Sequence, residues 1–202
     1  SGRTYNYYTY DNEVDNYGQD HYQLHFLHEV NKNLNFSVAG HYTRGKGYFE
    51  QYKAGEDFST YGFDPLVFTN DTVTTTDVIR RRWLDNHFYG GVFALNYNKK
   101  NLDLTFGGSA NAYQGGHYGE VIWAEFASQS DIRDRYYDND AFKIDLMSYL
   151  KATYSIKGFT FYGDLQYRHI DYNFLGFDEV DGVIVTLDQN TSYDFFNPKL
   201  GL

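Results

Sequence analysis

The sequence predicts an all-β fold, an antiparallel up-and-down meander of about six to seven strands. Three observations predict it. Apolar and polar residues alternate strictly over several segments, which is the period of a strand with two different faces. Short connections rich in Asn, Lys or Gly alternate with long connections along the chain. The 202 residues include 22 Tyr and 17 Phe but only 2 Pro, and aromatic residues favour strands whereas Pro interrupts them.

The first hairpin shows how the alternation fixes the register. Apolar side chains occupy every second position on both sides of the turn Asn-Lys-Asn, with polar side chains between them. A three-residue turn places Val30 opposite Leu34 and Phe26 opposite Val38. The two apolar faces then coincide, as a stable hairpin requires.

The same pattern assigns the rest of the chain. Three tight turns alternate with three long connections, so the long connections all lie at one end of the strands, and residues 1–18 resemble the tail of another such connection. The predicted strands are 20–30, 34–43, 82–97, 102–112, 141–154, 159–171 and 195–202, and the long loops are 44–80, 113–140 and 172–194.

Short turns at one end and long loops at the other are the plan of an outer-membrane β-barrel, whose apolar face meets lipid and whose polar face lines the lumen. A soluble β-sandwich or barrel has the reverse arrangement, and alternation alone does not distinguish the two. Two observations favour the barrel. Charged residues lie midway along the polar faces, as suits a wet lumen. Tyrosines lie near the strand ends, and tyrosine gathers at membrane interfaces. These tyrosines are Tyr42, Tyr97, Tyr154, Tyr167 and Tyr172.

Composition excludes several classes of protein. Without Cys, the chain has no disulfide framework and no Cys-based zinc site. A net charge of −10 without a basic stripe argues against nucleic acid as a partner. No apolar stretch is long enough for a transmembrane helix. No motif of a known catalytic class is present, so we predict no enzymatic activity.

Six or seven strands are too few to close a membrane barrel, so we expect a piece of a larger barrel or a chain that assembles with others.

Several phrases in the chain are distinctive. Together they resemble the middle of the barrel of TonB-dependent outer-membrane receptors of the Bacteroidetes type, and the resemblance covers nearly the whole chain. The phrases are RRRWLDNHFYGG at 80–91, HYGEVIWA at 117–124, RYYDN at 135–139, DLQYRHI at 164–170 and FFNPK at 195–199.

The resemblance implies a barrel of about 22 strands, closed by an N-terminal plug, that imports a scarce nutrient with energy from TonB. The nutrient would be a siderophore, haem, a vitamin or an oligosaccharide. The expected location is the bacterial outer membrane, and the expected partners are the remaining barrel and plug, membrane lipid and lipopolysaccharide, and TonB through regions outside this chain. No plug domain, TonB-contacting segment or terminal barrel strand is recognised here. The alternatives are a soluble cell-surface binding module, such as a carbohydrate-binding or adhesin-like domain, and a chain that completes a multi-chain barrel.

Aromatic residues gather in the predicted long loops. Aromatic rings that line a polar cavity can stack on sugars, haem or siderophore rings, so seven of them are candidate ligand contacts. The alternative is that they only pack on one another, as an ordered loop requires. The candidates are Tyr48, Phe49, Tyr52, Tyr61, Tyr118, Trp123 and Tyr136.

Three consecutive arginines, 80–82, lead into a predicted strand at its loop end. Guanidinium groups bind phosphate and carboxylate well. In a barrel they could meet lipopolysaccharide phosphates outside or an anionic ligand inside. Alternation places Arg81 on the face of Trp83 and its two neighbours on the other face. The alternative is that the arginines neutralise Asp77 and Asp85.

Three histidines share the polar face of the first hairpin. The predicted register places His41 opposite Gln23, with His21 and His25 diagonal to it. Neutral imidazoles can bind a transition metal or haem iron, but they also serve as ordinary polar residues of a lumen. We therefore predict no cofactor and no metal site, and keep these three histidines as the ones a metal could use.

Overall fold

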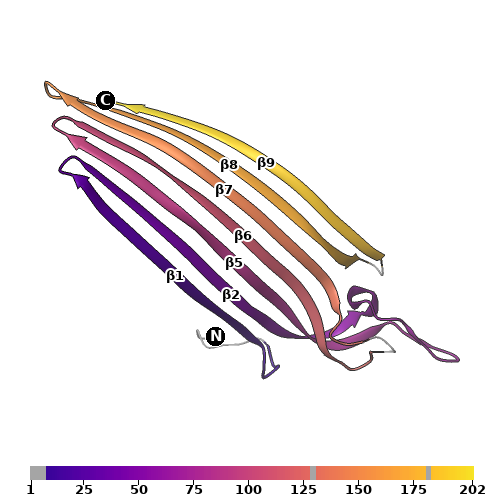
Figure 1. Cartoon of the computed structure of the whole chain (residues 1–202). Helices are drawn as coiled ribbons and strands as arrows, with labels where there is room; N and C mark the ends of the chain where they lie inside the picture. Colours follow the sequence, from indigo (N-terminus) through magenta and orange to yellow (C-terminus); the bar gives the residue numbers. More distant parts are fainter. Residues whose placement is uncertain (1–7, 128–130, 181–182) are drawn as a thin grey trace, which may run out of the picture.

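A single seven-stranded antiparallel sheet forms most of the structure, a computed structural model that describes residues 8–127, 131–180 and 183–202 (Figure 1). The strand order is β1-β2-β5-β6-β7-β8-β9, which confirms the predicted up-and-down meander. The strands are β1 (Val14–Asn31), β2 (Leu34–Asp57), β5 (Thr75–Lys99), β6 (Leu102–Ala124), β7 (Arg135–Ile156), β8 (Phe159–Val180) and β9 (Val183–Gly201).

Between β2 and β5 the chain forms a small separate unit. It consists of a 3-10 helix, η1 (Phe58–Tyr61), and a short hairpin of β3 (Leu66–Val67) and β4 (Thr72–Val73). Figure 1 shows this unit at the end of the sheet opposite the tight turns. We call these two ends the loop end and the turn end. Within the described residues, no helix is long and apolar enough to cross a membrane.

The turn-end boundaries and the register agree closely with the sequence prediction. Phe26 pairs with Val38, and Gln23 pairs with His41, as expected. The predicted pairing of Val30 with Leu34 is wrong, because the register shifts just before the turn and Leu34 pairs with Asn31 instead. Such a bulge places one extra residue on one strand.

The loop-end boundaries were predicted wrongly. The regions 44–80, 113–140 and 172–194 are largely strand, since β2 continues to Asp57, β5 begins at Thr75 and β6 continues to Ala124. Likewise, β7 begins at Arg135, β8 continues to Val180, β9 begins at Val183, and β1 begins at Val14 within the predicted tail. Strict alternation of apolar and polar side chains stops in these regions, but backbone hydrogen bonds hold the ladder together without it.

The polar face of the sheet is its concave face. Residues of η1 pack against Val78 and Val121, which lie at polar-face positions of β5 and β6. η1 also contacts β8, three strands further along the sheet than β5. A segment this short can touch both regions only if the sheet curves around it. The apolar face is therefore convex.

Backbones approach closely on the concave face. A Cβ atom added to Gly90 would lie 2.4 Å from the carbonyl oxygen of Ala110, and one added to Gly47 would lie 2.1 Å from that of Asn16. Glycine removes this obstacle. Small residues on the inner side therefore help the sheet to curve.

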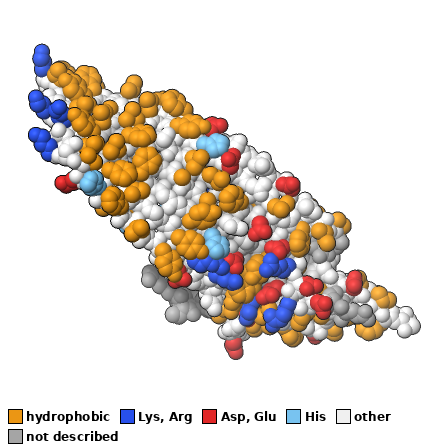
Figure 2. Space-filling model, in the orientation of Figure 1, with side chains coloured by type: hydrophobic (Ala, Val, Ile, Leu, Met, Phe, Trp, Pro, Cys, Tyr) orange, Lys and Arg blue, Asp and Glu red, His pale blue; other side chains and the backbone are white. Residues whose placement is uncertain are grey.

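The convex face carries an apolar band that begins at the turn end, and Figure 2 shows apolar side chains gathered over that half of the sheet. Its side chains are exposed in this chain, Leu24 by 79%. The run from Tyr22 to Val30 in β1 has the length of a tilted bilayer crossing. On every strand of the sheet, a polar residue ends the band at its loop-end edge. These residues, from β1 to β9, are Asp20, Arg44, His87, Gln114, Asp140, His169 and Asp194.

Tyrosines mark the edges of this apolar band. Tyr42 and Tyr167 lie at its loop-end edge, and Tyr97 and Tyr154 lie at its turn-end edge, as predicted. Tyr172 was assigned to the same set wrongly. It pairs with Lys143 on the concave face, because the predicted set took account of position along the strand but not of side-chain direction.

The turn between β7 and β8 provides a test of the backbone geometry. Gly158 has a φ of 87°, a region in which a side chain clashes with its own backbone. We expect Gly158→Ala to lower the free energy of unfolding by about 1 kcal/mol, measured by urea unfolding in detergent micelles. Gly163→Ala is the matched control, because its added Cβ would make only an ordinary 3.7 Å contact with Leu200. Equal losses in the two variants would contradict this description of the turn.

Candidate functional site

A packed aromatic cluster covers the concave face at the loop end, and we call it the mouth cluster. Tyr61 and Tyr136 meet edge to face, with ring centroids 4.8 Å apart. Phe58 is 1% exposed. The cluster fixes the segment between β2 and β5 against the sheet. Its members are Phe58, Tyr61, Phe63, Val78, Val121 and Tyr136.

Two arginines connect the mouth cluster to the sheet. Arg80 donates to the Tyr61 hydroxyl at 3.0 Å, and Nη1 of Arg80 lies 3.9 Å from the Glu56 carboxylate. Arg82 donates to the Tyr136 hydroxyl at 3.3 Å, and its guanidinium lies 5.7 Å from the centre of the Tyr137 ring. The cluster therefore holds two guanidinium groups, one of them near the Glu56 carboxylate, on the side of the sheet that curves inward.

Burial keeps the tyrosines of this region protonated. It raises the pKa of Tyr61, and the hydrogen bond that Tyr61 donates to Glu56 at 2.7 Å raises it further. Burial and the neighbouring Tyr136 raise the pKa of Tyr137 to about 12. These phenols therefore remain neutral hydrogen-bonding groups at physiological pH.

Three buried polar atoms toward the loop end of the concave face have no hydrogen-bond partner among the described residues. They are Nε of Arg80, Nε2 of His117 and Oδ1 of Asn139. His117 and Asn139 are direct cross-strand neighbours on β6 and β7. Burial lowers the pKa of His117, so its imidazole is neutral. Unpaired buried groups are costly, and here they supply both a donor and acceptors to a bound water or ligand.

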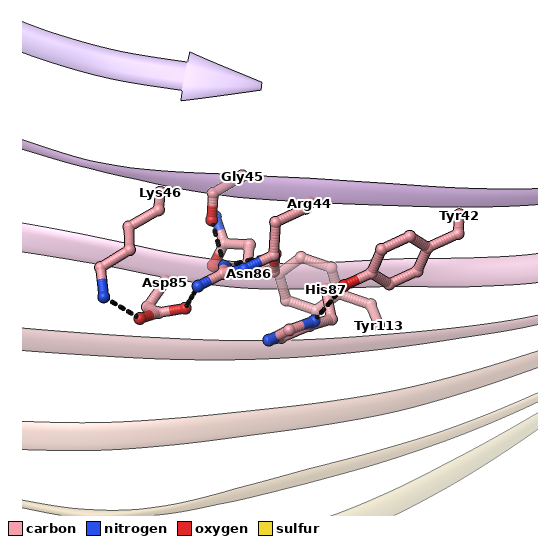
Figure 3. A network of polar contacts seen from close by, with 8 residues as sticks. All are labelled: Tyr42, Arg44, Gly45, Lys46, Asp85, Asn86, His87 and Tyr113. Atoms are coloured by element: carbon pink, nitrogen blue, oxygen red, sulfur yellow. Dashed lines mark hydrogen bonds and ion pairs between the residues drawn. The ribbon is translucent and has the colours of Figure 1, made fainter. Parts of the chain in front are cut away.

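The convex face carries a different polar network just beyond the apolar band, and Figure 3 shows it from close by. The carboxylate of Asp85 lies 2.5 Å from Nη2 of Arg44 and 3.0 Å from Nζ of Lys46. The Tyr42 hydroxyl lies 2.8 Å from Nδ1 of His87. The Asp85 carboxylate therefore compensates two cations at the level where the apolar band ends.

Further toward the loop end, the convex face bears stacked aromatic residues and cations. Trp83 lies between Tyr48 and Tyr118, with centroids 4.6 Å and 5.9 Å away. The Arg81 guanidinium lies 4.3 Å from the Tyr48 centroid, and that of Arg135 lies 3.7 Å from the Tyr118 centroid. These stacks face outward, and their rings already contact one another and the two guanidinium groups.

A buried carboxylate anchors the N-terminal part of the chain to this outer surface. Glu50 accepts hydrogen bonds from Tyr10 at 2.6 Å, Asn12 at 2.6 Å and Arg81 at 2.7 Å. Burial opposes ionisation of Glu50, but these three donors outweigh it and hold the pKa below its usual value. Arg81 therefore pairs with Glu50, not with Asp77 or Asp85 as the alternative reading proposed.

The structure does not bring the seven candidate aromatic residues together. Tyr61 and Tyr136 lie in the mouth cluster, and Phe49 is also on the concave face. Tyr48 and Tyr118 belong to the convex stack. The other two, Tyr52 and Trp123, are exposed at convex positions near the loop end.

The three histidines share the concave face, but each has its own partner. His21 contacts Thr43 at 2.9 Å, His25 contacts Gln23 at 3.3 Å and His41 contacts Asn111 at 2.9 Å. The described part of the chain contains no group of three or more metal-binding side chains.

The arginine assignment from the sequence is confirmed, since Arg81 shares a face with Trp83 and its two neighbours point to the other face. Sequence reasoning missed His117 and Asn139, because both lie in a region assigned to a loop. Continuing the alternation of β6 and β7 past the last apolar residue would have placed both on the concave face.

A curved meander with an apolar convex face and a polar concave face is a segment of a β-barrel wall. Among solved structures, the chain is similar to the ferric-catecholate import receptor Fiu of E. coli K12. Its open form superposes with a TM-score of 0.69 over 98% of this chain and 34% of the receptor chain, at 15% identity. Its closed form gives 0.57 over 94% and 31%, at 12% identity.

These likenesses show the fold, which matches a segment of a TonB-dependent receptor barrel. The chain spans about a third of the length of the receptor chains that it matches. No protein-family model matches the sequence. No curated protein matches it either.

The mouth cluster yields a stability prediction. Phe58→Ala should weaken the attachment of the segment between β2 and β5 by about 3 kcal/mol, because a large buried side chain is lost. Hydrogen exchange of the amides in this segment measures the change. Phe68→Ala is the matched control, since Phe68 belongs to the same segment and is 60% exposed. If both variants exchange alike, the segment is not held by the cluster.

Proposed function

We propose that the chain is a barrel segment of a TonB-dependent outer-membrane receptor, of the Bacteroidetes type that its sequence resembles, which imports a scarce nutrient. The observation that carries this proposal is the apolar convex face. Exposed apolar side chains form one continuous band across the strands, and a band of this size requires lipid or a partner to cover it. A soluble binding module would direct these side chains inward.

The concave face then lines the lumen. Its polar residues include the ion pair of Asp145 with Arg168, and such mixed charges suit a wet interior. The segment between β2 and β5 would narrow the external mouth. Strand ends that continue beyond the apolar band would extend the wall above the membrane.

The nutrient would meet the concave face at the loop end. Arg80 and Arg82 place two guanidinium groups there, and such groups bind anionic ligands well. Aromatic rings and neutral phenols beside them suit a ring-bearing ligand such as a siderophore or haem. Fiu imports ferric catecholate, which belongs to this chemical class. Vitamins and oligosaccharides remain substrates to test.

The proposed partners follow from this location. The remaining strands and a plug would close the barrel and fill its lumen, and TonB would act through the plug. Membrane lipid would cover the apolar band, and lipopolysaccharide headgroups would lie beside Arg44 and Lys46 at its edge.

Uptake by cells that carry the complete receptor tests the proposal. Deleting the receptor should abolish uptake of one labelled nutrient among ferric siderophore, haem, vitamin and oligosaccharide. Arg82→Gln should then weaken binding of that nutrient by about tenfold, as expected for loss of a charged hydrogen-bonding group. Arg135→Gln is the matched control, because Arg135 lies on the convex face.

Unchanged uptake of all four nutrient classes after deletion would contradict the import function. Equal effects of the two arginine variants would leave import standing but would contradict the assignment of the mouth.

A further inference from the structure

The Arg80 guanidinium at the mouth is already occupied by the chain itself. It donates to the Tyr61 hydroxyl at 3.0 Å and to the side-chain oxygen of Gln51 at 3.3 Å. The Glu56 carboxylate lies 3.9 Å from Nη1 of the same guanidinium. The Arg80 side chain is only 11% exposed, so an anion that arrives from outside reaches it only after one of these neighbours moves.

Tyr61 belongs to the part of the chain that covers Arg80. We call residues 58–74, which comprise η1 and the β3–β4 hairpin, the mouth segment. Within the described residues, no backbone hydrogen bond joins the mouth segment to a strand of the large sheet. Its attachment comes from side chains, through the rings of the mouth cluster and the Tyr61 hydroxyl. Such contacts can be exchanged for others without breaking the ladder of the sheet.

The present partners of Arg80 are weak acceptors. Tyr61 offers a neutral phenol, and the Glu56 carboxylate at 3.9 Å is beyond hydrogen-bond distance. Nε of Arg80 is buried and has no acceptor among the described residues. A guanidinium binds an anion more strongly than it binds a neutral acceptor, because the two charges attract each other. An anion that gains access to Arg80 therefore offers a better acceptor than the phenol it would displace.

Arg82 connects the accessible part of the mouth to the covered Arg80. Arg82 is partly exposed and donates to the Tyr136 hydroxyl at 3.3 Å. The Tyr136 ring in turn meets the Tyr61 ring edge to face, with centroids 4.8 Å apart. An anion that binds Arg82 would displace the Tyr136 hydroxyl and disturb the ring contact that holds Tyr61 in place. Binding at the accessible arginine would thus loosen the cover over the other.

We propose that Tyr61 and Glu56 are built-in competitors of the nutrient for the two mouth arginines. An anionic nutrient that binds Arg82 and Arg80 displaces the Tyr61 hydroxyl and loosens the mouth segment. Because coupling between two events is reciprocal, a change that weakens the attachment of the mouth segment strengthens binding of the nutrient. The inference rests on the proposed function, since it needs an anionic nutrient at the mouth.

The two competitors also determine specificity. A neutral ligand offers Arg80 no better acceptor than the Tyr61 phenol does, so it does not displace the mouth segment. Glu56 raises the threshold for an anion, because its carboxylate attracts Arg80 and repels an incoming negative charge. The pair therefore favours ligands that carry several negative charges close together, such as a ferric catecholate complex or the propionates of haem.

The opposite arrangement, in which the mouth segment closes as a lid over a bound nutrient, agrees less well with its packing. A lid must gain contacts with the ligand. The rings of the mouth segment are instead buried against the sheet, with Tyr61 5% and Phe63 6% exposed, and they have little surface left for a ligand.

Binding to the complete receptor in detergent tests the inference, with ferric tris-catecholate and haem as anionic probes and equilibrium dialysis as the measurement. Tyr61→Phe removes the hydroxyl but keeps the ring, and it should tighten binding about fivefold. A residue with only a structural role would weaken binding instead. Glu56→Gln should also tighten binding, because it removes the competing carboxylate. Tyr118→Phe is the matched control and should leave the affinity unchanged, since Tyr118 lies on the convex face.

Hydrogen exchange supplies a readout that does not depend on the variants. Saturating the unchanged receptor with the probe that it binds should speed exchange of the amides in the mouth segment. Amides beside Gly158, in the turn between β7 and β8, should exchange at the same rate with and without the probe.

The outcomes that would overturn the inference differ from those that would overturn the proposed function. If both variants bind an anionic probe more weakly or as tightly as the unchanged receptor, or if the probe slows exchange in the mouth segment, Tyr61 and Glu56 do not compete with it. An anionic nutrient at the mouth would then still stand. If the receptor binds neither anionic probe, the proposed anionic nutrient fails, and the inference fails with it.

Discussion

In the receptor segment that we propose, contact between the convex apolar band and lipid is the interaction on which the rest of the structure depends. Side chains such as Leu24 and Leu146 project from the outer side of a curved sheet, where the chain itself has no layer to cover them. Each buried side chain of this kind is worth about 1.5–3 kcal/mol once it is removed from water. Lipid is the solvent that covers such a band on every strand at once. The polar residues that end the band, and the tyrosines at its edges, then lie where water and headgroups begin.

The same constraint explains the concave face. Polar side chains inside a curved wall need partners, and they find them across strands, as Asp145 does with Arg168 and His41 does with Asn111. Where the wall rises above the band, the segment between β2 and β5 folds inward and packs through Phe58 and Tyr61. Among the described residues, four buried side-chain atoms, one of them Oδ1 of Asp164, have no such partner.

The sequence predicted the fold well at the turn end and poorly at the loop end, for one physical reason. Alternation is visible only where one face is apolar, so the tight turns and the pairing of Phe26 with Val38 could be predicted. Beyond Tyr42 the side chains of β2 no longer alternate between apolar and polar, yet the ladder continues to Asp57 through backbone hydrogen bonds that side-chain patterns do not report. The seven candidate aromatic residues lie on different faces of the sheet, and the prediction missed this for the same reason. Most of them were assigned to loops, where the direction of a side chain could not be predicted. The curvature of the sheet could be inferred only from a tertiary contact between η1 and β8. No local sequence pattern encodes such a contact.

Site-directed spin labelling along β7 in the complete, membrane-embedded receptor tests the central claim most directly. Single cysteines introduced from Leu146 to Lys151 have no native cysteine competing with them in this chain. The account predicts a period of two: labels at even positions collide with oxygen dissolved in lipid, and labels at odd positions do not. Oxygen accessibility that peaks at the odd positions, or that shows no alternation, would contradict a lipid-facing convex surface.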